Sequence, residues 1–217
     1  MSIKIIIADD HKLVSTSLIP LLNSQPGMQV VAEVGSGKKA VDLAATLKPD
    51  IVIMDIGMAE LNGIEATRQI VAKHPRIKII ILTMHADRRY ITEALKAGAS
   101  GYLTKGCSFE ELVTAIRTVS DNKKYLSPEI SEVIIQNSLS SSRDGQATVS
   151  PVLTKREREV LQLLAEGKTI KEIAYKCNVS IKTIYTHREK VMQKLKIDSI
   201  AGVIKYAIQS GLVSIHE

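Results

Sequence analysis

Several strongly apolar runs of this chain end on a charged or polar residue. The run IKIIIA is followed by Asp9 and Asp10, and the run IVIM is followed by Asp55. Two further runs, IKIIIL and SGYLT, are followed by Thr83 and Lys105. Because the carboxyl ends of parallel strands meet at one edge of a sheet, these five side chains are predicted to converge on one site.

The three carboxylates are the most informative part of this set. Acidic groups that lie close together repel one another unless a cation lies among them. A hard divalent ion, Mg²⁺ above all, takes oxygen ligands and keeps positions open for water and phosphate oxygens. Lys105 and the hydroxyl of Thr83, on the other side of the predicted site, are suited to bind an incoming anion. Each residue alone is more simply explained as a turn or cap residue, but together they indicate a Mg²⁺ and phosphate site.

Alternating elements must position these residues. Short β-branched runs predict strands, and the longer amphipathic stretches between them predict helices. Five strands that are each followed by a helix predict a five-stranded, doubly wound parallel α/β domain over residues 1–121. Ser108 and Glu111 form a predicted capping box for the last helix. The strands are expected at 3–8, 28–34, 50–55, 77–83 and 100–105, and the helices at 12–24, 37–48, 63–74, 88–97 and 109–120.

The rest of the chain divides into a connecting region and a second domain. Within residues 122–152, a Ser-Pro-Glu sequence at 127–129 predicts a short helix to about residue 138. The Ser-rich stretch 138–151 that follows predicts a flexible linker. Residues 153–217 predict an all-α domain of four short helices, two of which begin with Thr-x-x-Glu capping boxes at Thr154 and Thr169. This pattern is typical of a helix-turn-helix unit.

Composition narrows the class of protein. Residues 153–217 contain 12 Lys and Arg against 7 Asp and Glu, so most of the net charge of +6 lies where an anionic partner would be attracted. No apolar stretch approaches the roughly 18 residues that cross a bilayer, and acids interrupt the N-terminus before a signal-peptide core could form. Cys107 and Cys177 lie far apart, which argues against disulfides and structural zinc. We expect a cytoplasmic protein without membrane contact.

The strand-end residues together resemble the receiver domain of bacterial two-component response regulators. The resemblance implies that Asp55 is the nucleophile that takes a phosphoryl group from a phosphohistidine or a small phosphodonor. It also implies that Asp10, Asp55 and the backbone carbonyl of Gly57 bind Mg²⁺ directly, with Asp9 acting partly through water.

Three further roles follow from the same resemblance. Lys105 would pair with the phosphoryl oxygens, and Thr83 would bond one of them after a loop movement. Tyr102 would be the switch aromatic, whose burial changes when the threonine moves. One residue departs from the family pattern: Ala59 stands where the family commonly has proline, which predicts a more mobile loop. His11, which follows the acidic pair, is expected to be a local capping or turn residue.

The second domain contains a short helix, a tight turn and a longer helix from about residue 181. Amphipathic helices alone would equally suit a dimerisation or protein-binding module, but the local positive charge favours DNA. The residues from Leu153 to Leu195 resemble the LuxR/FixJ/NarL-type DNA-binding domain. By that resemblance Tyr185, Thr186 and Glu189 contact bases, and a helix at about 199–209 mediates dimerisation. The residues expected to contact phosphates are Lys182, Thr183, Arg188, Lys190 and Lys194.

Together these resemblances predict a NarL/FixJ-type response regulator that is phosphorylated on Asp55, dimerises and binds promoter DNA. Its expected partners are a sensor histidine kinase, double-stranded DNA, a second copy of the chain and RNA polymerase. One alternative is a constitutive DNA-binding regulator with a vestigial receiver, which Ala59 suggests. Another is an aspartyl-phosphate-type phosphatase, although that class expects Asp-x-Asp, whereas Asp55 is followed by Ile56 and Gly57. We do not expect an enzyme acting on a separate substrate.

Overall fold

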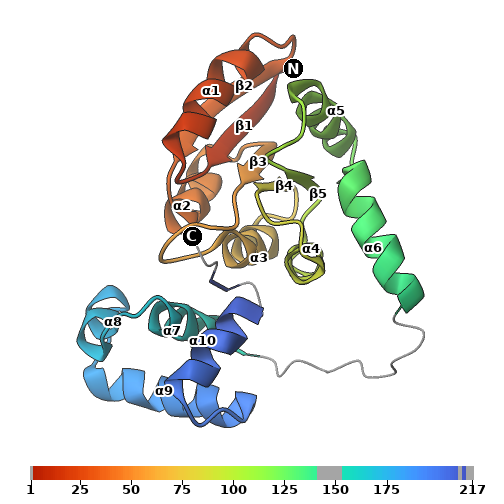
Figure 1. Cartoon of the computed structure of the whole chain (residues 1–217). Helices are drawn as coiled ribbons and strands as arrows, with labels where there is room; N and C mark the ends of the chain where they lie inside the picture. The colour runs from red at the N-terminus through yellow and green to blue at the C-terminus, as the bar shows by residue number, and fades with distance from the viewer. Residues whose placement is uncertain (1, 141–152, 210–211, 214–217) are drawn as a thin grey trace. The chain divides into compact units, whose positions relative to one another are not determined.

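The computed structural model describes residues 2–140, 153–209 and 212–213. The chain forms two compact units, Met1–Asp144 and Gly145–Glu217 (Figure 1). Each unit has its own hydrophobic core. Most of the predicted Ser-rich linker, residues 141–151, lies outside the described ranges. Within those ranges, no helix combines the length and the apolar character that a membrane span requires.

The first unit is a parallel sheet with the strand order β2-β1-β3-β4-β5-β6. The five predicted strands and the five helices that follow them are confirmed to within one residue at each end. Its elements are β1 (Ile3–Ala8), α1 (Lys12–Asn23), β2 (Met28–Val34), α2 (Gly37–Leu47), β3 (Ile51–Met54), α3 (Gly63–Lys73), β4 (Lys78–Thr83), α4 (Arg88–Lys96), β5 (Gly101–Thr104), α5 (Phe109–Ser120), β6 (Tyr125–Leu126) and α6 (Pro128–Ser140).

Helices cover both faces of this sheet (Figure 1). Alternate side chains of one strand enter different cores: Ile79 and Ile81 pack with α2, α3 and α4, whereas Ile80 and Leu82 pack with α1 and α5. All four residues of β3 are buried. A strand that is buried on both faces has no polar side, so its sequence is continuously apolar. The ends of such a strand are therefore the first positions at which polar side chains are expected.

A sixth strand corrects the predicted count of five. β6 pairs in parallel with β5, and Tyr102 lies opposite Leu126 in the register. The segment then turns into α6, whose Ile130 is fully buried in the core beside α4. A strand of two residues is too short to show a periodic pattern, so the sequence did not indicate β6. It indicated α6, but not that the first turns of α6 complete the core of the first unit.

Two glycines hold the loop after Asp55 close to the sheet. A Cβ built on Gly63 would lie 1.9 Å from the carbonyl oxygen of Asp55, and one built on Gly37 would lie 2.1 Å from the carbonyl oxygen of Leu61. The Gly63 amide donates a hydrogen bond to the Ile56 carbonyl at 3.1 Å. The start of α3 therefore packs directly on the backbone of Asp55, and side chains at these positions would displace it.

The described part of the second unit contains four helices, as predicted, around a core that includes Val160, Ile173, Ile184 and Val203. The capping boxes at Thr154 and Thr169 are confirmed, whereas Ser108 forms only its own half of the predicted box in the first unit. The helices are α7 (Lys155–Ala165), α8 (Ile170–Lys176), α9 (Ile181–Leu195) and α10 (Ile200–Gln209).

An ion pair connects α7 and α9. The buried Glu157 carboxylate accepts hydrogen bonds from the Thr154 amide and from Lys194 Nζ, both at 2.7 Å. Burial alone would raise the pKa of Glu157, but the bonds from Lys194 and Thr154 outweigh it and hold that pKa below its usual value.

Gly63→Ala is expected to destabilise the first unit by about 1–3 kcal/mol, because the new methyl overlaps the Asp55 carbonyl. Urea unfolding of the full chain measures the loss. Gly35→Ala is the matched control, since a Cβ there meets nothing nearer than 3.8 Å. Equal unfolding midpoints for the two variants would contradict the close packing described here.

Lys194→Met is expected to destabilise the second unit by about 1 kcal/mol at neutral pH, because it leaves the Glu157 carboxylate without its cation. A carboxyl whose folded pKa is lowered stabilises the fold above its unfolded pKa and loses that contribution as pH falls through the folded pKa. The loss should therefore shrink in acid. Urea unfolding at pH 7 and pH 4 tests this, with the exposed Lys182→Met as control; equal effects of both substitutions at both pH values would refute it.

Candidate functional site

The candidate site lies at the carboxyl ends of the strands, where the sheet order reverses. β1 pairs with β2 on one side and with β3 on the other, so the loops after β1 and β3 leave the sheet next to each other. Asp9 follows β1 directly and Asp55 follows β3, and both side chains are only 4% exposed. In doubly wound sheets this reversal is the usual position of a ligand site.

Lys105 joins the two buried carboxylates. Its Nζ lies 2.8 Å from Asp9 Oδ2 and 3.0 Å from Asp55 Oδ2, and the lysine side chain is 7% exposed. Burial would lower the pKa of Lys105, but the hydrogen bond to Asp9 and the charge of Asp55 outweigh it and raise that pKa. The lysine is therefore an ammonium ion whose single charge offsets part of the charge of the two acids, a contact that the sequence did not predict.

Asp10 and His11 complete the cluster on its solvent side. Asp10 is 36% exposed, and its Oδ1 lies 2.9 Å from His11 Nδ1. His11 occupies the N-cap position of α1, but its side chain makes no capping hydrogen bond. Of the two expected roles, the turn is confirmed by the His11 amide, which donates to Asp9 Oδ1, whereas the side chain does not cap the helix. The ring Nδ1 lies 3.2 Å from Asp9 Oδ1 and 3.8 Å from Asp55 Oδ2.

The donor set fits a divalent cation. One ligand atom from each of Asp9, Asp10, His11 and Asp55 lies within 4.8 Å of the others. Two ligands on opposite sides of a small divalent ion are about 4.2 Å apart, so a small adjustment of these side chains encloses one ion. Gly57, whose carbonyl is a predicted ligand, lies half-buried two residues after Asp55.

Thr83 and Tyr102 meet at one residue of the loop after β4. The buried Thr83 hydroxyl accepts a hydrogen bond from the His85 amide at 3.4 Å. The Tyr102 hydroxyl donates to the His85 carbonyl at 2.8 Å, and the tyrosine is fully buried. Desolvation raises the pKa of Tyr102 far above its ordinary value, so it stays a neutral donor. The two predicted switch residues are thus connected through the backbone of one residue, His85.

The predicted DNA-contacting side chains lie on α9. Ile184 and Val191 face the core, whereas Lys182, Thr186, Glu189 and Lys190 are exposed and Tyr185 is 47% exposed. Two of the proposed phosphate ligands already have local partners. Thr183 contacts the cap residue Ser180, with 2.8 Å between the hydroxyl oxygens, and Lys194 pairs with Glu157.

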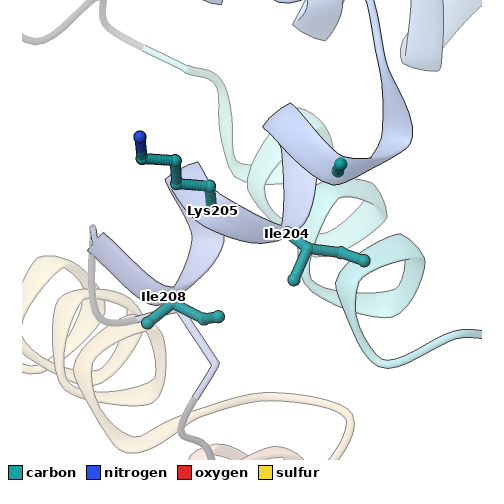
Figure 2. A pocket seen from close by; sticks show the side chains of 4 residues that line it. Ile204, Lys205 and Ile208 are labelled. Carbon is teal, nitrogen blue, oxygen red and sulfur yellow. The ribbon is translucent and has the colours of Figure 1, made fainter.

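Helix α10 presents a partly apolar surface. Ile200 is 46% exposed and Ile204 is 38% exposed. Figure 2 shows Ile204, Lys205 and Ile208 lining a pocket on this helix, together with Ala201. The helix that was predicted for dimerisation therefore exists at residues 200–209 and exposes side chains suited to a contact with another protein surface.

The main feature that sequence reasoning missed is the placement of His11. The signal was its position directly after Asp9 and Asp10, since a residue adjoining an acidic pair at a strand end must lie near the same site. The sequence could not reveal which way the ring turns, because an N-cap histidine can as easily face its own helix.

Comparison with known proteins identifies both units. Residues 5–117 match the response regulator receiver domain, and residues 151–207 match the LuxR family of bacterial regulatory proteins. The oxygen regulatory protein NreC of Staphylococcus carnosus is 38% identical over 214 residues, which are 97% of this chain and 99% of NreC. The response regulator GacA of Pseudomonas aeruginosa is 35% identical over 211 residues, which are 97% of this chain and 98% of GacA.

Similar solved structures are also response regulators. A LuxR-family response regulator from an Aurantimonas species is 36% identical, has a TM-score of 0.62 and covers 64% of this chain and 99% of its own. RcsB from Salmonella enterica serovar Typhimurium, bound to a promoter with the phosphomimetic BeF₃⁻, is 26% identical, has a TM-score of 0.61 and covers 96% and 99%. The chain belongs to the two-component response regulators in which a receiver domain is joined to a LuxR-type DNA-binding domain, the NarL/FixJ type.

Proposed function

We propose that a sensor histidine kinase or a small phosphodonor phosphorylates this regulator on Asp55, and that phosphorylation promotes dimerisation and promoter binding in the cytoplasm. The observation that carries the proposal is the buried Asp9–Lys105–Asp55 cluster, in which one ammonium ion lies between two carboxylates at the switch point of the sheet. This arrangement holds the nucleophile and a cation for the incoming anion in one place.

Mg²⁺ is the cofactor that these residues suit, with Asp9, Asp10, Asp55 and the Gly57 carbonyl as its ligands. When bound, it would reduce the repulsion between the carboxylates and the phosphoryl oxygens. Asp55 forms the new O–P bond as the P–N bond of the phosphohistidine breaks, and the imidazole leaves with the electron pair. Lys105 then keeps its charge beside the phosphoryl group that Asp55 carries. No separate substrate is turned over, so we do not assign the protein an enzymatic activity.

The contacts at His85 support a route for the switch. If the Thr83 hydroxyl turns toward the phosphoryl group, the His85 amide loses its acceptor. The carbonyl of the same residue, His85, accepts the hydrogen bond from Tyr102. A movement of His85 therefore affects both hydrogen bonds. Phosphorylation then shifts the population between two arrangements of this loop.

The exposed face of α9 supports DNA binding as the output. We propose base contacts from Tyr185, Thr186 and Glu189, and phosphate contacts from Lys182, Arg188 and Lys190. Thr183 and Lys194 stay in the proposed phosphate set, although each already has a local partner in this structure.

The exposed apolar residues of α10 support a contact with a second copy of the chain. A structure of the related RcsB contains two dimers bound to DNA, and this relative is 26% identical with a TM-score of 0.60. RNA polymerase is proposed as the further partner through which promoter binding changes transcription.

One observation favours an alternative, namely constitutive DNA binding with a vestigial receiver. Ala59, in place of the proline expected from the resemblance, is exposed in the loop after Asp55, and Glu60 next to it adopts a positive φ of 67°. DNA affinity measured with and without Mg²⁺ and beryllofluoride separates the two functions: a regulated protein gains affinity, and a constitutive one does not.

Asp55→Asn is expected to abolish incorporation of phosphate from acetyl phosphate in the presence of Mg²⁺, because the amide cannot form the acyl phosphate. Intact-mass spectrometry at neutral pH measures the added phosphoryl group. Asp42→Asn, on the exposed surface of α2, is the matched control and should be labelled like the unmodified chain. Retained labelling of the Asp55 variant would refute the assignment of the nucleophile.

Lys190→Ala is expected to weaken binding to specific and unrelated DNA alike. It should reduce the slope of log affinity against log salt by about 1 per protomer, because each neutralised phosphate contributes roughly that amount. Fluorescence anisotropy over a salt series measures both. Lys73→Ala, which removes the same charge from the end of α3, is the control; a loss confined to one operator base pair would contradict the phosphate role of Lys190.

A further inference from the structure

His11 is placed over the acidic cluster by the backbone. The amide of His11 donates a hydrogen bond to Asp9 Oδ1 at 2.8 Å, which closes a tight turn directly after β1. The ring Nδ1 then lies 2.9 Å from Asp10 Oδ1, 3.2 Å from Asp9 Oδ1 and 3.8 Å from Asp55 Oδ2. The side chain is 52% exposed, so the ring lies at the open side of the cluster.

These distances are those of neighbouring ligands on one metal ion. Ligand atoms that are each about 2.1 Å from an ion lie about 3.0 Å apart at a right angle and about 3.4 Å apart at a tetrahedral angle. The three distances from Nδ1 bracket these values. A ring that only donated a hydrogen bond would need one carboxylate partner. The Nδ1 atom of His11 instead lies close to oxygens of three carboxylates, those of Asp9, Asp10 and Asp55.

An imidazole changes which ions such a site prefers. Carboxylates and carbonyls suit hard ions such as Mg²⁺, whereas a nitrogen ligand adds affinity for first-row transition ions, increasingly from Mn²⁺ to Ni²⁺. We propose that His11 is a nitrogen ligand of the metal site, and that it makes the receiver bind Mn²⁺, Co²⁺ and Ni²⁺ more tightly than its carboxylates alone would. The inference rests on the proposed divalent-ion site at Asp9, Asp10 and Asp55.

Lys105 and His11 differ in burial at the cluster. Lys105 Nζ bridges Asp9 and Asp55 and is buried, whereas the exposed His11 ring contacts Asp10 and Asp9. Lys105 Nζ lies 3.4 Å from His11 Nδ1. The imidazole and Asp10 are thus the exposed members of the cluster, and the lysine is a buried member.

The test is direct metal binding to the full chain, prepared without a polyhistidine tag. Mn²⁺ binding is followed by its electron paramagnetic resonance signal, and Mg²⁺ and Ni²⁺ are measured by competition against it. Pulsed measurements detect nitrogen coupled to the bound Mn²⁺. The variants are His11→Ala and the control His74→Ala, which removes a histidine at the C-terminus of α3, next to the opposite end of the sheet.

We expect nitrogen coupling in the unmodified chain and in His74→Ala, and its loss in His11→Ala. Affinity should fall by roughly 3- to 10-fold for Mn²⁺ and by about 30-fold or more for Ni²⁺, while Mg²⁺ changes by less than about 3-fold. Absence of nitrogen coupling, or an equal loss for Mg²⁺ and Ni²⁺, overturns the proposal.

Combined with the mass measurement of phosphorylation, these measurements separate this inference from the proposed phosphorylation. Phosphorylation on Asp55 with Mg²⁺ but without nitrogen coupling refutes the His11 ligand alone. Nitrogen coupling without phosphorylation supports the ligand and refutes the proposed phosphorylation on Asp55. If the chain binds none of these ions, the metal site and therefore the His11 ligand are both refuted.

Discussion

The Lys105 ammonium between the buried carboxylates of Asp9 and Asp55 is the interaction on which the rest of the first unit depends. Two acids with 4% exposure would repel each other strongly without a cation between them. The sheet makes this arrangement unavoidable, because three apolar strands end at the same edge. In this structure the lysine is the cation that both acids share, so the metal ion and the anion of the proposed function would bind by replacing its contacts.

Much of this architecture could be predicted from the sequence, for identifiable reasons. Strands buried on both faces are continuously apolar, so their limits and the acids that follow them were visible in the residues alone. The helix caps at Thr154 and Thr169 were visible because a capping box has a fixed spacing. β6 was not visible, since two residues carry no period, and the packing of α6 depends on Ile130, one apolar residue among several in its helix.

The sequence predicted which residues lie at the site, but not which contacts their side chains make. Sequence placed Asp9, Asp55 and Lys105 at one edge but could not show that the lysine already bridges the acids. The same limit applies to Lys194, whose charge suggests DNA while its Nζ contacts Glu157. The partner of a long side chain depends on three-dimensional neighbours that are distant in the sequence, and no local pattern encodes them.

The connection between Thr83 and Tyr102 runs entirely through main-chain atoms of residue 85, the amide at one side and the carbonyl at the other. The imidazole of His85 takes no part in it and instead stacks on Tyr90, with 4.5 Å between ring centroids. Substitutions at this position can therefore change how stiffly the loop rests on α4 while both hydrogen bonds persist. In the proposed switch, position 85 would then set the stiffness of the loop without any change at Thr83 or Tyr102.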